Sequence, residues 1–248
     1  MSYREFFQKK HTLLAVVHVE SVQQSLRNTA IAYENGADGV FLINHANSVR
    51  ELLATYRGIR ALYPSYFIGL NLLGMESWEM FCIVPVNVSG VWSDSVGICE
   101  GNPDPTEEAR RSWNIRKERS DWRGIYFGGV AFKYQETVSD PGRVAKLALL
   151  YVDVITTSGD RTGAPPSIGK IKKMRSAIGP DVPLAIASGM TPENVSGYLS
   201  SADCFLVATG MSKSFTDLDP LRVAAFADVL KESTREGGMR GISNSTFE

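Results

Sequence analysis

Short apolar runs rich in Val, Ile, Leu and Phe recur eight times along the chain, and each is followed by a polar or glycine-containing break and a segment with helical spacing. Continuous apolarity, rather than strict alternation with polar residues, is typical of parallel strands that helices cover. Eight repeats of strand and helix are the number that closes such a sheet into a barrel. The runs span residues 13–19, 39–43, 66–72, 86–92, 124–132, 153–157, 183–187 and 204–208.

The length of the chain agrees with this architecture. A single α/β barrel has roughly 250 residues, and this chain has 248, so no second domain is required. The predicted fold is therefore α/β, a single (β/α)8 TIM barrel. We expect the barrel and a helical lead-in at its N-terminus to occupy residues 1–236, and residues 237–248 to form a flexible C-terminal tail.

The breaks between the runs carry helix signals. An Asp-Pro or Thr-Pro pair caps a helix and begins it, and such pairs stand at 104–105, 140–141, 191–192 and 219–220. Gly36 and Gly179 are typical of helix ends that turn into the next strand. Residues 76–84 are so few that we expect a short or irregular third helix, after which Pro85 opens the fourth strand.

Composition excludes several classes of partner. Hydrophobic residues make up 44% of the chain and charged residues 21%, which is typical of a globular domain with a large core. A net charge of −1 provides no field for nucleic acid or an anionic membrane. The chain has no apolar run of the roughly 18 residues that a membrane span needs, and its first residues lack the order of a secretory signal. The widely spaced Cys82, Cys99 and Cys204 are typical of reduced thiols, with Cys204 in the core, so we expect a cytoplasmic protein.

Glycine-containing turns follow the last three predicted strands, at 157–163, 187–191 and 208–212. Glycine lets backbone N–H groups approach an anion, and Ser and Thr add donors. The loops after strands seven and eight are the recurrent phosphate site of this fold, although tight turns alone would explain the glycines. The predicted phosphate-binding residues are Ser188, Gly189, Thr209 and Gly210. We expect a bulky side chain at either glycine to obstruct the anion and leave the fold intact.

Three ionisable side chains at strand ends are the predicted catalytic groups. His18 ends the first run, where a core imidazole is an equally good interpretation. Asp94 follows the fourth run and suits a general base or a metal ligand, whereas its alternative role is to cap a turn. Lys133 ends the fifth run, where an amine can form a Schiff base or bind an anion, or else make an ordinary salt bridge.

Further polar residues at the same ends are predicted to bind substrate: Asn44, Asn71, Asp160, Arg161 and Gly163. A metal site built from His18, His45, Asp94 and Glu100 is the alternative, but the chain has three histidines and no metal-binding spacing. We therefore predict neither metal nor cofactor. The aromatic residues Trp78, Trp113, Trp122 and Tyr126 are interpreted as core or as a subunit interface in a homo-oligomer.

Three segments resemble the BtpA/SgcQ family, and the resemblance extends over nearly the whole chain. They are Gly36-Ala37-Asp38-Gly39 leading to Asn44, the loop from Asp94 to Gly101, and Ser188-Gly189-Met190-Thr191-Pro192-Glu193-Asn194-Val195 with the following Tyr198-Leu199 and Ala202-Asp203. The resemblance implies a TIM barrel whose phosphate loops are related to those of phosphoribosylanthranilate isomerase. One branch of the family is linked with photosystem I assembly and another with a sugar-transport gene cluster.

This sequence departs from the family at two places. The histidine-rich proline loop after the first strand is reduced to 17–20, and an arginine after the third strand is replaced around Gly74. The function we predict is a lyase or isomerase acting on a small phosphorylated sugar or phosphoribosyl compound. A non-catalytic assembly or regulatory factor is the alternative, because barrels host both kinds of protein. Glycosyl or phosphoribosyl transfer is less favoured, since the chain has no recognisable diphosphate motif.

Overall fold

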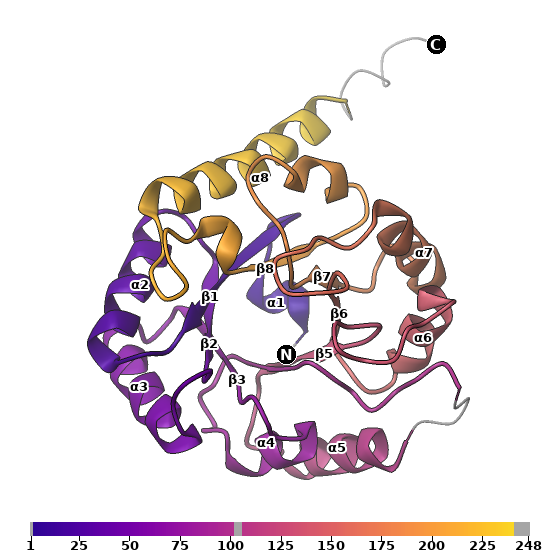
Figure 1. Cartoon of the computed structure of the whole chain (residues 1–248), viewed down its shortest axis with the longest axis horizontal. Coiled ribbons are helices and arrows are strands. Elements are labelled where there is room, and N and C mark those ends of the chain that lie inside the picture. Colours follow the sequence, from indigo (N-terminus) through magenta and orange to yellow (C-terminus); the bar gives the residue numbers. More distant parts are fainter. Residues whose placement is uncertain (1, 102–105, 241–248) are drawn as a thin grey trace.

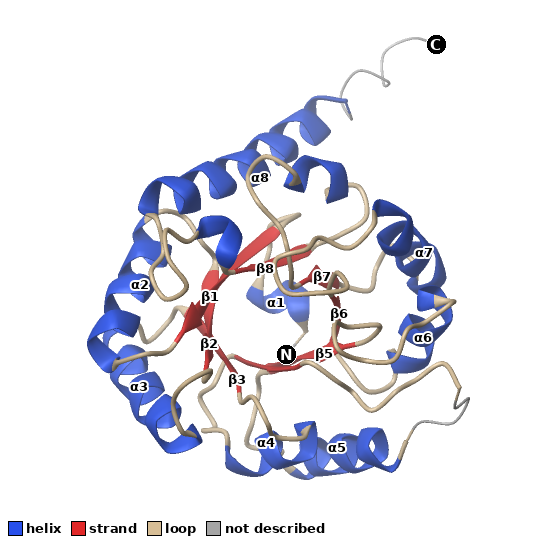
Figure 2. Ribbon diagram, in the orientation of Figure 1, coloured by secondary structure: helices blue, strands red, loops and turns tan. Residues whose placement is uncertain are grey.

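The computed structural model describes residues 2–101 and 106–240, with side chains up to Ser233. Eight parallel strands, paired in sequence order and closed between β8 and β1, form one barrel that helices surround (Figures 1 and 2). This confirms the predicted (β/α)8 architecture. The strands are β1 Thr12–His18, β2 Gly39–Ile43, β3 Phe67–Asn71, β4 Gly90–Ser93, β5 Ile125–Gly129, β6 Val154–Thr157, β7 Leu184–Ile186 and β8 Cys204–Val207.

The helices follow the strands in the expected alternation. They are α1 Tyr3–Phe6, α2 Val22–Glu34, α3 Val49–Leu62, α4 Ser77–Ile83, α5 Glu107–Glu118, α6 Pro141–Ala148, α7 Ile168–Ile178 and α8 Pro220–Arg240, with 3₁₀ turns η1 Val195–Tyr198 and η2 Thr209–Met211. The helix α4 between β3 and β4 has seven residues, as its short segment predicted. Asp140 caps α6 through its side chain, and Gly36 and Gly179 have φ of +91° and +82° after their helices. These cap predictions are confirmed.

Apolar side chains form two layers, one inside the barrel and one between the barrel and its helices. Phe41, Phe67 and Phe127 point inward, and their rings pack edge to face within 6.2 Å of one another. A larger cluster, with Tyr56 and Phe226 among its members, lies between the strands and the outer helices. The helices bury their apolar stripes in that outer layer, so packing rather than intrinsic propensity fixes them around the sheet.

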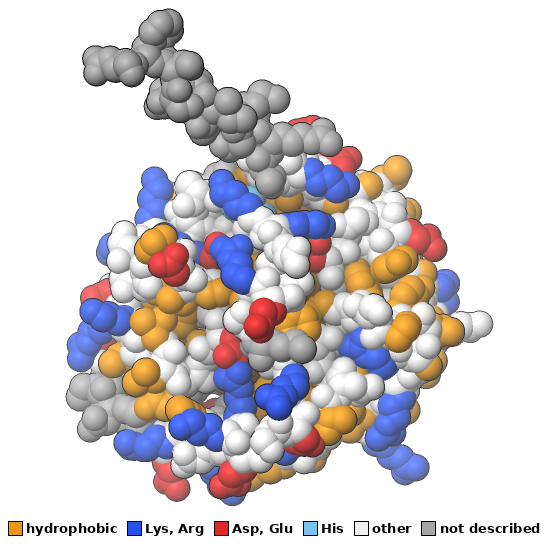
Figure 3. Space-filling model, turned by 180° about the vertical axis from the view of Figure 1, so that it is seen from behind, with side chains coloured by type: hydrophobic (Ala, Val, Ile, Leu, Met, Phe, Trp, Pro, Cys, Tyr) orange, Lys and Arg blue, Asp and Glu red, His pale blue; other side chains and the backbone are white. Residues whose placement is uncertain are grey.

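The N-terminal helix α1 packs at the amino end of the barrel and appears in the centre of Figure 1. Tyr3 donates a hydrogen bond to Oγ1 of Thr12, the first residue of β1, over 2.7 Å. Phe7 packs against Phe67, the first residue of β3, with 4.9 Å between the ring centroids. This end of the barrel is therefore covered, and the carboxyl ends of the strands are left for a site. On the reverse face, Lys and Arg side chains alternate with acidic and apolar ones (Figure 3).

Several predicted boundaries differ from the structure. Residues 86–89 precede β4 in a turn in which Val88 N–H donates to the Pro85 carbonyl, so Pro85 does not open that strand. The fifth strand ends at Gly129, before the predicted 132. No α-helix begins at Thr191-Pro192, because Asn194 accepts from Thr191 N–H and donates to the Gly189 carbonyl, which directs the chain into η1.

The two remaining differences concern helix ends. Thr106 caps α5 by accepting from Ala109 N–H, whereas the predicted cap at 104–105 lies outside the described residues. Helix α8 continues to Arg240, four residues into the segment predicted as a tail, and 241–248 lie outside the described residues. None of the helices in the described part of the chain has both the length and the hydropathy that a membrane span requires.

Candidate active site at the carboxyl ends of the strands

The parallel strands bring the predicted catalytic residues to one end of the barrel. His18 ends β1, Asp94 follows β4, and Lys133 lies in the loop after β5. All three line a cavity of about 340 Å³ at this mouth. The loops after β6, β7 and β8 also line it, through residues that include Gly163 and Gly189. The cavity therefore combines ionisable side chains with glycine-containing turns.

His18 is held in a dry environment beside a second imidazole. Its ring centroid lies 4.6 Å from that of His45 and 4.2 Å from that of Phe215. Burial, and then the neighbouring His45 and Lys133, lower the pKa of His18 to about 4. Its Nδ1 atom is buried and has no hydrogen-bond partner among the described residues. His18 is thus a neutral imidazole at pH 7.

Asp94 is a partly buried carboxylate near cations. Burial raises its pKa, whereas Lys133, the hydrogen bond from Asn71 and the nearby His45 lower it. Asn71 Nδ2 donates to Asp94 Oδ1 over 3.2 Å, and Gln135 Nε2 donates to the Asp94 carbonyl over 2.7 Å. Side chain and backbone of Asp94 are therefore both fixed. A carboxylate whose pKa is raised by burial is a stronger general base at neutral pH than an exposed one.

Lys133 lies in a loop with unusual backbone geometry. Ala131 and Tyr134, on either side of it, have φ of +47° and +66°, values that non-glycine residues rarely adopt. Lys133 N–H donates to Ser158 Oγ over 2.7 Å, which ties the loop to the end of β6. The Lys133 ammonium makes no ion pair or hydrogen bond with any described residue. Its charge is available to a ligand in the cavity.

The turn after β7 offers free backbone donors. The N–H groups of Ser188, Gly189 and Met190 donate to no described residue, and Gly189 has a φ of +66°. Consecutive free N–H groups in such a turn make an anion-binding concavity. The Ser188 hydroxyl instead donates to the Ala164 carbonyl over 2.8 Å, so it joins the loops after β6 and β7. Thr209 begins η2 and is exposed beside this turn.

The glycines of the predicted phosphate turns face other backbone segments. A Cβ atom on Gly210 would lie 1.8 Å from the Met190 carbonyl oxygen, and one on Gly189 would lie 2.1 Å from the nitrogen of Pro165. Both distances are far below van der Waals contact. Our expectation that a bulky residue at either position leaves the fold intact is therefore wrong, because close loop packing requires these glycines whether or not an anion binds.

The predicted substrate-binding residues differ in their places around the cavity. Asn44 is buried and structural, since its Oδ1 accepts from Leu73 N–H over 2.8 Å, and Asn71 orients Asp94. Gly163 lines the cavity. Asp160 lines an adjoining cleft that Lys133 shares, whereas Arg161 is exposed and lines neither space. Substrate contact by these residues remains a prediction.

The sequence analysis did not identify three residues at or near the mouth. Phe215 comes from the loop after η2 and packs on His18 although its side chain is 63% exposed. Trp92 of β4 lines the cavity with its Nε1 atom buried and without a described partner. Lys170 of α7 reaches the loop after β5. For Lys170 a signal existed, since a cation in the first turn of a helix opposes the helix dipole.

The alternative metal site is not assembled in the described residues, where no group of three His, Cys, Asp or Glu side chains converges. His18 and His45 are adjacent, but Glu100 is engaged elsewhere. Its carboxylate accepts from Ser139 N–H over 2.6 Å and from Asp140 N–H over 2.7 Å. The three cysteines form no disulfide, and Cys204 is buried as predicted.

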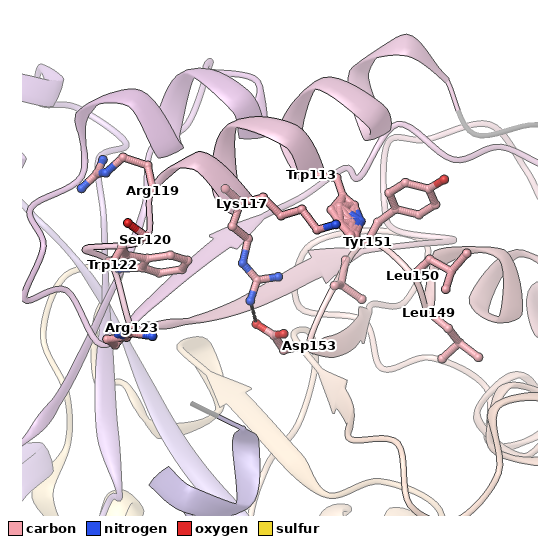
Figure 4. A pocket seen from close by; sticks show the side chains of 13 residues that line it. Trp113, Lys117, Arg119, Ser120, Trp122, Arg123, Leu149, Leu150, Tyr151 and Asp153 are labelled. Carbon is pink, nitrogen blue, oxygen red and sulfur yellow. Dashed lines mark hydrogen bonds and ion pairs between the residues drawn. The ribbon is translucent and has the colours of Figure 1, made fainter.

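A second cavity, of about 410 Å³, lies between the end of α5 and the loop from α6 to β6 (Figure 4). It is lined by Trp113, Lys117 and Tyr151, and Asp153 pairs there with Arg116. The Lys117 ammonium lies 3.7 Å above the Trp113 ring. These loops precede strands, and catalytic residues of barrel enzymes follow strands. Trp122 and Tyr126 nearby are buried, as the core interpretation predicted.

Comparison with solved structures agrees with the architecture. Phosphoribosyl anthranilate isomerase from Thermus thermophilus is 14% identical over 90% of this chain and 99% of that one, with a TM-score of 0.63. (S)-3-O-geranylgeranylglyceryl phosphate synthase from Thermoplasma acidophilum, solved with its substrate sn-glycerol-1-phosphate, is 14% identical over 94% and 99%, with a TM-score of 0.64. Thiamine phosphate pyrophosphorylase from Pyrococcus furiosus is 12% identical over 91% and 98%, with a TM-score of 0.62.

Fold and cavity thus define the class as a single (β/α)8 barrel with an open mouth at the carboxyl ends of its strands. No protein-family model and no curated protein matches the sequence. Identities of 12–14% show the shared fold alone.

Proposed function

We propose that this chain is an enzyme of the lyase or isomerase kind that binds a small phosphorylated sugar or phosphoribosyl compound in the mouth of the barrel. The observation that carries the proposal is that ionisable side chains and free backbone N–H groups meet in one cavity. His18, Asp94 and Lys133 line it together with the turn after β7, whose N–H groups have no partner among the described residues. Its volume of about 340 Å³ fits a small organic ligand.

The free amides of Ser188, Gly189 and Met190 would hold the phosphate, since each N–H gains a partner that only water supplies otherwise. Thr209 and Gly210 border the same opening. Three of the similar solved structures have names that include a phosphorylated compound: phosphoribosyl anthranilate, geranylgeranylglyceryl phosphate and thiamine phosphate. These names support the choice of a phosphorylated ligand.

The ionisable side chains that line the cavity suit proton transfer next to a carbonyl group. Asp94 would remove the proton from the carbon, because its partial burial strengthens it as a base. The Lys133 ammonium would stabilise the negative charge that develops on the carbonyl oxygen, or its amine would form an imine with that carbon. The protonated Asp94 would then return that proton to the neighbouring carbon, and the neutral His18 would hydrogen-bond the substrate.

The resemblance to the BtpA/SgcQ family is part of the same proposal and leaves the reaction open. The unpaired cysteines support a cytoplasmic location. A homo-oligomer, which the sequence predicts, is part of the same proposal.

The test combines binding and chemistry. Thermal shift would compare phosphorylated sugars with the same sugars lacking phosphate, because a ligand of the native state raises the melting temperature. NMR in deuterium oxide would then follow exchange of the proton beside the carbonyl of a stabilising ketose phosphate. We expect phosphate-dependent stabilisation, and exchange that Asp94→Asn abolishes. Equal stabilisation by free sugars, or unchanged exchange in Asp94→Asn, would contradict the proposal.

A further inference from the structure

Lys170 lines the cleft beside the mouth cavity that Lys133 and Asp160 also line. It is the third residue of α7, and its own N–H donates to the capping Ser167. Its ammonium donates to the Ala131 carbonyl over 2.5 Å and to the Ser158 carbonyl over 2.7 Å. One side chain therefore joins helix α7 to the loops after β5 and β6.

Two features make this position costly for a cation. The first turn of a helix carries partial positive charge, so an ammonium there is repelled. Burial lowers the pKa of Lys170 to about 8, although the charge of nearby Asp160 raises it. The free-energy cost of removing an ammonium from water is offset less by two neutral carbonyls than it would be by a paired carboxylate. Stability alone thus does not explain a lysine at this position.

One of the two carbonyls that Lys170 binds, that of Ala131, belongs to the loop with unusual backbone geometry. Ala131, with a φ of +47°, also accepts from Thr157 Oγ1 over 3.1 Å. Ser158, whose carbonyl takes the second bond from Lys170, accepts the Lys133 N–H on its hydroxyl. Lys170 therefore contacts Ala131, two residues before Lys133, and also Ser158, whose hydroxyl binds the Lys133 N–H. A backbone conformation that costs free energy persists only where several surrounding contacts hold it in place. The hydrogen bonds from Lys170, Thr157 and Lys133 N–H hold this loop.

We propose that Lys170 is a positioning residue for Lys133: by holding the carbonyls of Ala131 and Ser158 it fixes the loop that directs the Lys133 amine into the mouth cavity. The role rests on the proposed function, in which Lys133 meets the carbonyl group of the substrate. It assigns Lys170 no contact with substrate.

Pyridoxal 5′-phosphate is a suitable probe, because it carries both an aldehyde and a phosphate. The Lys133 amine attacks the aldehyde carbon, water leaves as the imine forms, and borohydride supplies the hydride that reduces the imine to a secondary amine. Peptide mass spectrometry locates the label, and the visible absorbance of the imine gives its rate of formation. We expect Lys133 to be labelled in the wild type. A label on Lys170 instead would overturn the proposal, because its amine would then be free.

The decisive variant is Lys170→Met, which keeps an unbranched chain and removes the donors. We expect the labelling rate of Lys133 to fall about tenfold or more, since small misplacements of a reacting group cost that much. Lys172→Met, on the exposed side of the same helix, should react like the wild type. If Lys170→Met does not fold, Lys170→Gln, whose polar side chain is shorter than that of lysine, takes its place and should show the same loss.

Hydrogen exchange provides a second measurement that needs no ligand. The Lys133 amide should lose protection in Lys170→Met while amides of β5 keep theirs. Wild-type labelling and wild-type protection at Lys133 in a folded Lys170→Met protein would overturn the inference. Failure of the proposed function appears differently, because pyridoxal without phosphate would then label the wild-type protein as fast as pyridoxal 5′-phosphate does.

Discussion

Protonation of His18 should destabilise the folded protein by a measurable amount. Its pKa is about 4 in the fold, because burial, His45 and Lys133 all disfavour the imidazolium ion. In the unfolded chain the value returns to about 6.5. Between these pH values the unfolded state binds more protons, so the free energy of unfolding rises with pH. The difference of about 2.5 pH units corresponds to roughly 3 kcal/mol, which is lost as the pH falls from 7 to 4.

Urea unfolding between pH 4.5 and 7.5 measures this effect. His18→Gln removes the titrating group and keeps a polar side chain, so its stability should depend on pH less than that of the wild type, by about 2 to 3 kcal/mol over the range. His45→Gln should raise the pKa of His18, because the neighbouring charge is removed. NMR titration of the His18 ring gives the pKa directly. A value near 6, or equal pH dependence in His18→Gln and wild type, would refute the reasoning.

Other predictions concern packing and exposure. Gly210→Ala should destabilise the protein by about 3 kcal/mol in urea unfolding, because its Cβ would overlap the Met190 carbonyl, whereas Gly169→Ala in α7, with no atom within 4 Å, should stabilise it by about 0.5 kcal/mol. An equal effect of both variants would contradict the close loop packing. A thiol reagent should modify the exposed Cys82 at once and the buried Cys204 only after unfolding, and early labelling of Cys204 would argue against the core. Tyr3→Phe should lower the free energy of unfolding by about 1 kcal/mol, because the hydrogen bond to Thr12 is lost. An unchanged urea midpoint would show that this contact of α1 does not stabilise the fold.

The sequence predicted the barrel because hydrophobic runs and helix caps depend on local patterns that alternate eight times. It failed where a tertiary contact decides the outcome. The apolar Val86 and Val88 suggested an early start for β4, but they belong to the turn that begins at Pro85. Thr191-Pro192 has the pattern of a helix start, yet the Asn194 side chain takes the hydrogen bonds that a helix would need.

The site was predicted in part for the same reason. Strand ends converge in any closed barrel, so His18, Asp94 and Lys133 were identifiable from their positions along the chain. The ring contact of His18 with Phe215 joins residues almost 200 positions apart, and no local pattern shows it. Lys170 was missed because Lys172 and Lys173 beside it make the segment resemble a solvated helix face.

The central claim is that the turn after β7 binds phosphate at the mouth of the barrel. Amide chemical shifts in a ¹⁵N-labelled sample, followed while ribose 5-phosphate is added, test it most directly. We predict that the resonances of Ser188, Gly189 and Met190 shift together and saturate, and that ribose leaves them unchanged. Unchanged resonances at these three amides, with shifts at Trp113 and Lys117 of the second cavity instead, would contradict the claim.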